Sequence, residues 1–526
     1  MLRQVARILR RPRAPSPGYP AEGLGDARYQ ISEGGQPCAS MIRERAYDRE
    51  LLGTIGPADS LVLRAMESDT IVAVVTPPGE GGVGIVRASG PLSSTLAERL
   101  FAGIRSSWPS HQLRHGQIVD PVSGSVVDQA LGCLMRAPRS YTGEDIFEIH
   151  CHGSPLALER VVQLCLREGC RAARPGEFTL RAFLNGRLDL SQAEAVVDVV
   201  RARTNTGLDL AVRQLSGWLS ERVEPVRQDL IGVLAHMEAM VDFVEDDIPP
   251  QADAATEARL QKDLRAIETL LEGAEQGIIL REGATLAIVG SPNVGKSSIM
   301  NALLGLDRSI VTPVPGTTRD TVEETLQVRG VPFRTIDTAG ITETSDAVEQ
   351  IGVNRSRQTL HGADVVLLVL DRSRSFSQQD ELAVQAIEAS RENNGHNQRL
   401  IVTLNKADLP SRIDASGAIE RTQPLAVVQS SAVQLAGIEE LRGALEEAAL
   451  GNARPEFVVG NVRHQDALRR SAAALRDALR GLSDGTPLDL VSFDVRAAAQ
   501  AIGEICGANV DDEVLDRIFR DFCIGK

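Results

Sequence analysis

The residues best suited to chemistry lie at positions 290–297, which read Gly-Ser-Pro-Asn-Val-Gly-Lys-Ser. An apolar, β-leaning run at 286–289 precedes them, and residues 298–304 read as the first turns of a helix. Glycines let a loop curl so that its N–H groups point at phosphate oxygens, and a helix N-terminus adds partial positive charge. The spacing predicts a phosphate-binding loop in which Lys296 reaches the β- and γ-phosphates and Ser297 ligates Mg²⁺.

A second set of residues has the chemistry to recognise guanine. Residues 405–408 (Asn-Lys-Ala-Asp) follow the apolar run 400–404, which places them at the end of a predicted strand. A carboxylate there accepts hydrogen bonds from N1–H and the 2-amino group of guanine, donors that adenine does not offer in that arrangement. We expect Asp408 to select guanine, Asn405 to contact the far edge of the base, and residues 431–433 to back the base.

Two further pieces lie between these motifs. Residues 337–340 (Asp-Thr-Ala-Gly) follow a strand-like run, and residues 316–320 (Gly-Thr-Thr-Arg-Asp) precede it. Each piece alone could be an ordinary turn, but the five in this order predict a GTPase domain. The predicted GTP contacts are Asn293, Val294, Gly295, Lys296, Ser297, Ser298, Thr312, Pro313, Val314, Pro315, Gly316, Thr317, Thr318, Asp337, Thr338, Ala339, Gly340, Asn405, Lys406, Ala407, Asp408, Ser431, Ala432 and Val433.

One position departs from the best-known GTPase pattern. Ile341 stands where a glutamine would orient the attacking water, and isoleucine cannot hydrogen-bond water. No arginine finger is obvious in the chain either, so catalysis needs another residue to position water and another cation. Asn293 is a candidate ligand for K⁺, with backbone carbonyls of residues 312–317 completing the cage. A simple turn residue is the alternative interpretation of Asn293.

Composition limits the partners of the chain. It has 526 residues, a net charge of −15, 43% hydrophobic and 3% aromatic residues. The length suggests about three or four domains. The acidic balance does not favour nucleic acid, so any RNA contact requires a local basic patch. Five arginines near the C-terminus have two interpretations, a basic patch of this kind or a solvated helix face: Arg463, Arg469, Arg470, Arg476 and Arg480.

Cysteine and histidine usage argues against structural disulfides and zinc. The seven cysteines are scattered and odd in number, which suits free thiols in a reducing compartment and hence a cytoplasmic location. His150 and His152 share one face of a strand, but no second ligand pair has zinc spacing, which favours a structural or pocket-lining pair. No apolar run reaches about 18 residues, so no membrane span is expected.

Residues 1–66 differ in composition from the remainder. Five of the first thirteen residues are arginine, which resembles an organellar transit peptide and would imply mitochondria or plastids. The acidic residues that follow, and Met66 just before the first predicted strand, instead favour an over-long gene start or a disordered extension.

The hydrophobic pattern divides the rest of the chain into three parts. Short β-like runs alternate with helical stretches over residues 67–186, which predicts an α/β domain. Long helical periods over 187–282 and again over 451–526 predict an all-α domain in two parts. A P-loop GTPase domain of the Ras-like, parallel-sheet kind is expected at 283–450, inserted between them. Residues 191–194 (Ser-Gln-Ala-Glu) are expected to form a capping box for the first long helix.

Six sequence words outside the GTPase motifs carry a specific resemblance. They are TPPGEGGVGIVR at 76–87, YTGED at 141–145, RPGEF at 174–178, RAFLN at 181–185, LDLSQAEA at 188–195 and FCIGK at 522–526. Together with the GTPase motifs, they make residues 68–526 similar to the MnmE (TrmE) family of tRNA-modification GTPases. The terminal Cys-Ile-Gly-Lys is short but very characteristic.

The resemblance implies a folate-binding N-terminal domain that makes a homodimer, a helical domain and an inserted G domain. It also implies a reaction, the addition of a carboxymethylaminomethyl or aminomethyl group to C5 of the wobble uridine, U34, of certain tRNAs. The implied partner is an MnmG-type protein that brings FAD and joins a heterotetramer. A reduced folate, 5,10-methylenetetrahydrofolate or 5-formyltetrahydrofolate, is the implied source of the one-carbon unit.

The resemblance also implies where folate binds. Its contacts fall on Arg87, Glu148, Arg187 and Lys526, with arginine at position 187 where the family pattern has lysine, so the geometry of that contact can differ. Cys523 matches the cysteine of the terminal motif, for which a structural role and a catalytic thiol are the two interpretations.

For the G domain, the resemblance implies cation ligands and a water-orienting acid. Glu349 matches the acidic residue that orients the attacking water through a second water, which suits the vacancy at Ile341. The implied Mg²⁺ ligands are Ser297 and Thr318, and the implied K⁺ ligands are Asn293, Thr312, Val314 and Thr317.

A second class of function remains compatible with the G domain alone. A regulatory GTPase of the ribosome-assembly kind would carry the same nucleotide motifs without modification chemistry. The N-terminal words and the terminal Cys-Ile-Gly-Lys favour the tRNA-modifying enzyme.

Overall fold

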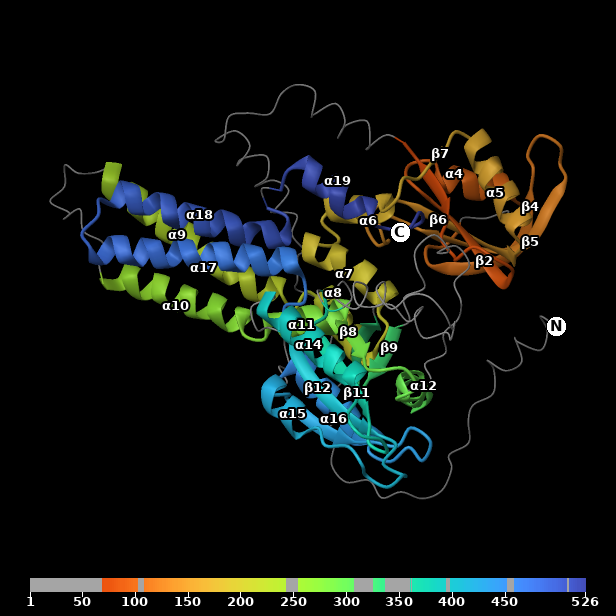
Figure 1. The fold of residues 1–526 in the computed structure, drawn as a ribbon. Helices are drawn as coiled ribbons and strands as arrows, with labels where there is room; N and C mark the ends of the chain where they lie inside the picture. The colour runs from red at the N-terminus through yellow and green to blue at the C-terminus, as the bar shows by residue number, and fades with distance from the viewer. Residues whose placement is uncertain are drawn as a thin grey trace, which may run out of the picture. The chain divides into compact units, whose positions relative to one another are not determined.

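The computed structural model describes residues 69–102, 108–242, 254–306, 325–335, 360, 362–393, 398–451, 458–508 and 510–526. The hypothesis about residues 1–66 lies outside these ranges. The three expected parts are described in turn below (Figure 1).

The N-terminal part is a seven-stranded sheet in the order β3-β4-β5-β6-β2-β1-β7. The β1–β7 pair is parallel and the other pairs are antiparallel. The strands are β1 (Ile71–Val74), β2 (Gly81–Ser89), β3 (Phe101–Ala102), β4 (Gln112–Val119), β5 (Val126–Met135), β6 (Ile146–Gly153) and β7 (Arg171–Ala172). The helices are α4 (Ser93–Leu100), α5 (Pro155–Arg167) and α6 (Glu177–Leu184). Apolar residues of α4 and α5 share one core with the sheet, which accounts for their amphipathic pattern.

The helical part comes from both sides of the G domain in the sequence, as expected. Its core joins α9, α10, α17 and α18, which lie side by side in Figure 1. The helices are α7 (Leu190–Arg201), α8 (Asn205–Leu215), α9 (Ser220–Asp242), α10 (Ala254–Leu271), α11 (Ala274–Glu282), α17 (Val462–Ser483), α18 (Leu488–Cys506) and α19 (Asp512–Arg520). The fold class predicted from hydrophobic periodicity is thus confirmed for this part.

The predicted capping box at residues 191–194 is wrong by two residues. Helix α7 is capped by Asp189, whose side chain accepts a hydrogen bond from the Gln192 N–H while the Gln192 side chain accepts one from the Asp189 N–H. Glu194 points instead into the interior, where it pairs with Arg463 and His464. The carboxylate that local spacing assigned to the helix cap therefore pairs with residues of α17 instead.

The G domain contains a six-stranded sheet in the order β13-β12-β11-β8-β10-β9, parallel except for β9. Its strands are β8 (Ala284–Val289), β9 (Thr325–Val328), β10 (Val331–Thr335), β11 (Val365–Asp371), β12 (Arg399–Asn405) and β13 (Ala426–Gln429). Its helices are α12 (Lys296–Leu306), α14 (Gln378–Asn393), α15 (Ser416–Thr422) and α16 (Ile438–Leu450).

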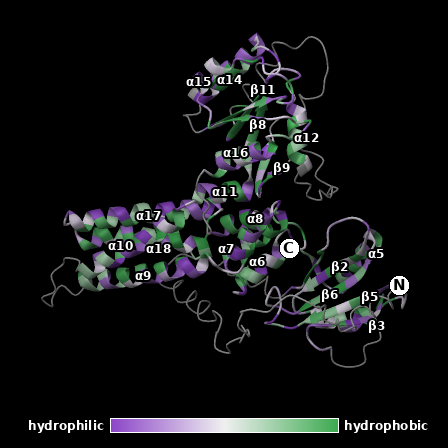
Figure 2. Ribbon diagram, turned by 90° about the horizontal axis from the view of Figure 1, so that it is seen from below, coloured by the Kyte–Doolittle hydropathy of each residue, from purple (hydrophilic) through white to green (hydrophobic). Residues whose placement is uncertain are grey.

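Alternate residues of the G-domain strands enter two different cores. Val365, Leu367 and Val369 of β11 face α12 and α16, whereas Val366 and Leu368 face α14 and α15. A strand covered on both faces must be apolar throughout, and Figure 2 shows β8 and β11 as hydrophobic. Helices therefore cover both faces of a parallel sheet, the arrangement that brings the carboxyl ends of β8, β11 and β12 to one edge.

Candidate functional site

The phosphate-binding loop connects β8 to α12 and requires glycine at two positions. Gly290 has φ +151° and Gly295 has φ +97°, conformations that residues with a Cβ rarely adopt. A Cβ at Gly290 would collide with the carbonyl oxygen of Val369, and one at Gly295 with the amide of Asn405. The two glycines thus let the loop pass close to β11 and β12.

Lys296 lies at the N-terminus of α12 with its ammonium group directed at the loop. Its Nζ donates hydrogen bonds to the carbonyl oxygens of Gly290 and Ser291, at 2.8 and 2.9 Å. Burial lowers the pKa of the amine, because a desolvated ammonium is unfavourable without an anion. Ser297 is exposed beside it, so both predicted phosphate and Mg²⁺ ligands start the same helix.

Asn293 has φ +61°, the left-handed region that asparagine tolerates better than most residues. It is exposed at the tip of the loop. This geometry agrees with a turn residue and leaves its amide available to a ligand.

A buried carboxylate behind the phosphate loop is a contact that the sequence analysis missed. Asp380 is 1% exposed and accepts hydrogen bonds from the hydroxyls of Ser291 and Ser377, while Arg374 lies 3.2 Å away. Burial favours the neutral acid, but these donors outweigh it and lower the pKa of Asp380. Ser377 and Asp380 also exchange backbone contacts at the start of α14. The Ser-x-x-Asp spacing was a local signal for the cap, but nothing local indicated Ser291.

Asn405 connects two loops of the G domain. Its side chain is 2% exposed, donating to the carbonyl oxygen of Val294 at 2.8 Å and accepting from the Ala432 N–H at 3.3 Å. Both ends of the amide are therefore engaged within the protein. Asn405 ties the phosphate loop to the loop at 431–433.

Asp408 is oriented by the same loop. Its Oδ1 accepts a hydrogen bond from the buried Ser431 hydroxyl at 2.6 Å. Lys406 adopts φ +64° and forms an ion pair with Asp371 at 2.7 Å. Burial favours the neutral form of Asp371, but this pair and Ser373 outweigh it and lower its pKa. Three predicted motif residues are thus held in place at the carboxyl ends of β11 and β12: Asn405, Lys406 and Asp408.

The remaining nucleotide predictions lie outside the described residues. They concern the attacking-water residue Glu349, the position of Ile341, and the ligands Thr312, Pro313, Val314, Pro315, Gly316, Thr317, Thr318, Asp337, Thr338, Ala339 and Gly340.

A second site lies in the N-terminal domain, where β2 and β6 pair Arg87 with Glu148. The Arg87 Nε lies 2.8 Å from Glu148 Oε1, and His150 Nε2 lies 3.2 Å from Oε2. Burial alone would raise the pKa of Glu148, but His150 and Arg87 outweigh it and lower the pKa. The carboxylate is therefore held in its charged form.

The Arg87 guanidinium lies over two aromatic rings that the sequence analysis did not assign. Its Cζ lies 5.5 Å from the centroid of Tyr141 and 5.6 Å from that of Phe178. Such cation–π contacts fix the orientation of the arginine. Both aromatics belong to the family words at 141–145 and 174–178, which was the signal that could have identified them.

The C-terminal Lys526 reaches this same site. Gly525 lies so close to β1 that a Cβ would strike the Val74 carbonyl. The pKa of Lys526 is lowered by burial and then by the positive charge of Arg87. Lys526 and Arg87 are thus neighbouring cations, an arrangement that favours an anionic ligand. The residues therefore fit a group with both negative charges and hydrogen-bond donors, such as a folate.

Arg187 lies close to the same loop by a different contact. Its Nε donates to the carbonyl oxygen of Ser140 at 3.1 Å, directly before Tyr141 in the chain. Its side chain is exposed. Arg187 thus contacts Ser140, and Arg87 lies over the ring of the next residue, Tyr141.

Arg181 organises the base of this domain and was not predicted. It is 2% exposed and pairs with Asp69, Glu144 and Glu177. Arg171 also holds Asp69 and Glu177. This network joins β1, β7 and α6, the elements that position Arg87 and Phe178.

The remaining residues singled out from charge and metal-ligand patterns have the following surroundings in the structure. Among the described residues no group of three His, Cys, Asp or Glu side chains could hold a metal ion. His152 pairs with Asp128 at 2.8 Å, and Cys523 is an exposed free thiol. The arginines of α17 are engaged by acids or amides: Arg463 by Glu194, Arg469 by Gln465, Arg470 by Glu504, Arg476 by Glu268 and Arg480 by Asp477.

Comparison with known proteins identifies the family of the chain. Residues 190–523 match the family profile of the MnmE helical domain, and residues 70–187 match that of the N-terminus of the GTP-binding protein TrmE. The chain belongs to the MnmE family. A tRNA modification GTPase MnmE of Roseiflexus sp. is 47% identical over 472 residues, which cover 87% of this chain and 99% of that protein.

Further relatives agree with this assignment. The MnmE proteins of Chloroflexus aurantiacus and Alkaliphilus oremlandii are 46% and 42% identical, each over 87% of this chain and covering 100% and 99% of their own lengths. The G domain of the T. maritima FeoB iron transporter matches with 27% identity and a TM-score of 0.23, over 32% of this chain and 98% of that domain. Membership in the MnmE family confirms the predicted GTP hydrolase and favours it over a ribosome-assembly switch.

Proposed function

We propose that this MnmE-family chain is a K⁺-dependent GTPase that forms the 5-carboxymethylaminomethyl or aminomethyl group on wobble uridine U34 of certain tRNAs. An MnmG-type protein carrying FAD would act with it, and a reduced folate would supply the carbon. The observation that carries this proposal is the placement of the chain end: Gly525 packs against Val74 of β1, which pairs with Val86 next to Arg87, so that Lys526 lies near the Arg87–Glu148 pair. A switch protein without modification chemistry has no need of such a group of charged residues.

In the N-terminal domain, Arg87 and Arg187 would bind the negative groups of the folate. Glu148, held as a carboxylate, would accept hydrogen bonds from the pterin N–H groups. Lys526 would add a third positive charge from the end of the chain. The two aromatic rings near Arg87 help keep its guanidinium in place, so the site is pre-organised for an anion.

In the G domain, Lys296 would bind the β- and γ-phosphates and Asp408 the guanine. Mg²⁺ bound by Ser297 and Thr318, and K⁺ bound by Asn293, Thr312, Val314 and Thr317, would supply the positive charge that an arginine finger supplies in other GTPases. Glu349 would orient the attacking water. Glu349→Ala should then lower GTP turnover by roughly 10²-fold with little change in GTP affinity. Unchanged turnover in that variant would rule out the role.

The proposed assembly is a homodimer through the N-terminal domain that joins two MnmG-type subunits. Exposed apolar side chains of β4 and β5 support this: Leu113, Val126 and Leu131. The proposed domain boundaries are 67–186, 187–282, 283–450 and 451–526. No helix in the described part of the chain is long and apolar enough to span a bilayer. We propose a cytoplasmic location.

The decisive experiment is nucleoside analysis of tRNA from a strain that lacks this gene. Loss of the modified wobble uridine, restored by the full chain, is the expected result. A chain without its last four residues should hydrolyse GTP normally and fail to restore the modification, because Lys526 is removed. Normal wobble uridine in the deletion strain would refute the proposed function, and full restoration by the truncated chain would refute the role of Lys526.

A further inference from the structure

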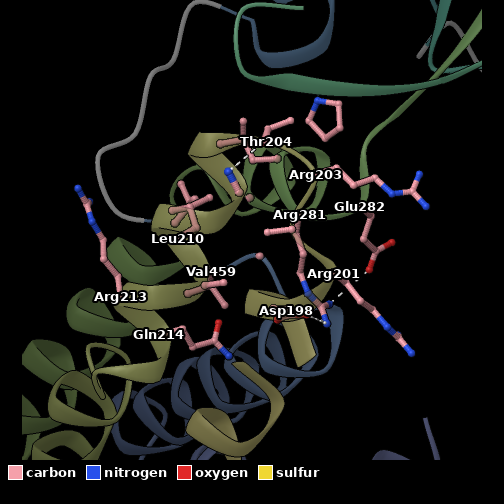
Figure 3. A pocket seen from close by; sticks show the side chains of 18 of the residues that line it. Asp198, Arg201, Arg203, Thr204, Leu210, Arg213, Gln214, Arg281, Glu282 and Val459 are labelled. Atoms are coloured by element: carbon pink, nitrogen blue, oxygen red, sulfur yellow. Dashed lines mark hydrogen bonds and ion pairs between the residues drawn. The ribbon is translucent and has the colours of Figure 1, made fainter. Parts of the chain in front are cut away.

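A cavity of ≈ 410 Å³ lies where the chain passes between the helical part and the G domain. Its walls come from the end of α7, helix α8 and the residues that follow it, the second half of α11, strand β10 and residues 458–460 (Figure 3). The α11 end and residues 458–460 are the segments through which the chain enters and leaves the G domain. The cavity is therefore built around both connections.

The lining is strongly basic in a chain whose net charge is −15. It contains two carboxylates, Asp198 and Glu282, against five arginines: Arg201, Arg203, Arg213, Arg281 and Arg334. A local excess of positive charge of this kind runs against the bulk electrostatics of the molecule. It is the kind of patch that an RNA contact on this acidic chain requires.

One arginine uses most of the available negative charge. Arg281 pairs with Asp198 at 2.9 Å and with Glu282 at 3.4 Å. Burial opposes the charge of Arg281, but Asp198 outweighs it and raises the pKa of the guanidinium. Both carboxylates of the lining are thereby engaged.

Two exposed arginines lie beyond this pair, Arg201 and Arg203. In Figure 3, the side chains of Arg201 and Arg203 extend to the same side of the cavity, beyond the Arg281–Asp198 pair. Arg201 donates to the backbone oxygen of Asp521, and within the described ranges neither it nor Arg334 has a carboxylate at ion-pair distance. Arg201 and Arg334 are therefore not neutralised by a carboxylate of the described residues.

Helix α8 adds to the same potential. Thr204 caps it by accepting a hydrogen bond from the Gly207 N–H at 3.0 Å, and both residues line the cavity. The N-terminus of this 11-residue helix contributes partial positive charge. The arginines of α17 offer no such surface, because acids of neighbouring helices neutralise Arg463, Arg470 and Arg476.

We propose that the mouth of this cavity binds a phosphate group of the tRNA backbone. The arginines Arg201, Arg203 and Arg334 would contact the phosphate oxygens, for which the planar guanidinium is well suited. This inference rests on the proposed function and names the surface that holds its substrate. Such contacts position the RNA without reading its sequence.

The test measures binding of fluorescent tRNA to the full chain, without GTP or folate, at several KCl concentrations. The double variant Arg201→Gln/Arg203→Gln should bind about five- to tenfold more weakly at low salt. The slope of log K against log[salt] should fall by roughly one to two, because each lost phosphate contact removes about one released counterion. Arg201→Lys/Arg203→Lys keeps both charges and should retain most of the slope.

A matched control is Arg476→Gln/Arg480→Gln on α17, which removes two exposed but ion-paired arginines. It should leave affinity and slope unchanged, and both glutamine variants should keep parental GTP turnover and melting temperature. Parental affinity and slope in Arg201→Gln/Arg203→Gln would overturn the proposal.

Titration with inorganic pyrophosphate separates a tRNA site from a site for a free anion. Loss of pyrophosphate binding in the double variant, with unchanged tRNA binding, would also overturn the proposal. The binding assay does not require modification chemistry, so wobble-nucleoside analysis can fail without affecting this result, and the reverse holds as well.

Discussion

One carboxylate oxygen of Asp408, the residue proposed to select guanine, is engaged within the protein. The Ser431 hydroxyl holds Oδ1, and Asn405 and Ala432 fix the loop from which Ser431 projects. The orientation of a single side chain thus depends on a brace between two loops. Residue-level chemistry in this domain is set by such contacts rather than by side-chain type alone.

Asp408→Asn should change the base preference from guanine to xanthine. The substitution replaces a double acceptor by a donor and an acceptor, so one guanine donor would face an amide N–H. A lost charge-assisted pair costs roughly 2–4 kcal/mol, or about 30- to 1000-fold in affinity. Affinities for GTP, ATP and XTP measure it, with Asp414→Asn as the control on an exposed carboxylate. A variant that still prefers GTP as strongly as the parent would contradict the assignment.

Asp380→Asn should loosen the phosphate loop. The substitution removes the charge that accepts from Ser291 and Ser377 and pairs with Arg374, and it weakens the cap of α14. We expect a stability loss of about 1–2 kcal/mol and weaker GTP binding. Thermal unfolding of the full chain and nucleotide titration measure the two effects. Parental GTP affinity in a destabilised variant would show that Asp380 supports α14 but not the loop.

At the scale of elements, α7 connects several parts of the molecule. Asp189 caps it directly after Arg187, Glu194 pairs with Arg463 of α17, and Asp198 pairs with Arg281 of α11. One helix therefore holds both chain segments that lead to the G domain. Burial would raise the pKa of Glu194, but His464 and Arg463 lower it well below its usual range. This pair stabilises the fold at neutral pH and is lost only in strong acid.

The contact between α9 and α10 should make stability depend on pH. Asp263 is 2% exposed, and burial together with the charge of Asp229 raises its pKa from 3.8 to about 7. The folded chain then keeps a proton that the unfolded chain releases near pH 4. Stability from this pair is therefore present in acid and is lost as the pH rises from about 4 to about 7.

Asp263→Asn should flatten this dependence. The amide has the shape of the protonated acid and can still donate a hydrogen bond to Asp229. Between pH 5 and pH 8, the parent should lose stability and the variant should not, so the difference between their melting temperatures should shrink or change sign. Relative to the parent, the variant should gain on the order of 1 kcal/mol or more over this range. Asp477→Asn, on the exposed face of α17, is the control. An unchanged difference between parent and variant across this range would show that Asp263 is already ionised.

At the scale of the whole molecule, GTP hydrolysis should require K⁺ and the pairing of two G domains. Ile341 cannot orient water and no arginine finger is apparent, although such a finger supplies about 10³–10⁵ in rate where it is used. The left-handed, exposed Asn293 offers its amide oxygen to an ion. Turnover should rise steeply in KCl and remain low in NaCl at equal ionic strength.

Asn293→Ala should abolish the difference between the two salts. The equal ionic strength controls for screening, and GTP affinity in both salts controls for loss of binding. Association of the chain should be followed with a GDP–aluminium fluoride mimic in KCl and in NaCl. Equal rates in both salts, with G domains that stay apart in the presence of the mimic, would contradict this mechanism.

The sequence by itself determined the GTPase and its family. The phosphate loop, residues 405–408 and the terminal Cys-Ile-Gly-Lys are contiguous words, and strand, loop and helix follow one another along the chain. Hydrophobic periodicity also determined the three-part fold, because a strand covered on both faces and an amphipathic helix leave different patterns. Local spacing was sufficient to predict sites whose residues lie close together in the sequence.

Only the tertiary structure decided which distant residues meet. Glu194 and Arg463 are 269 residues apart, and local spacing assigned Glu194 to a helix cap. Asn405 became a brace because β12 brings it against Val294, and Lys526 approaches Arg87 because Gly525 packs on β1. The arginine-lined cavity likewise depends on how α7, α8, α11 and β10 pack. Packing between elements is set by the sum of many apolar contacts, so no short run of residues records these partners.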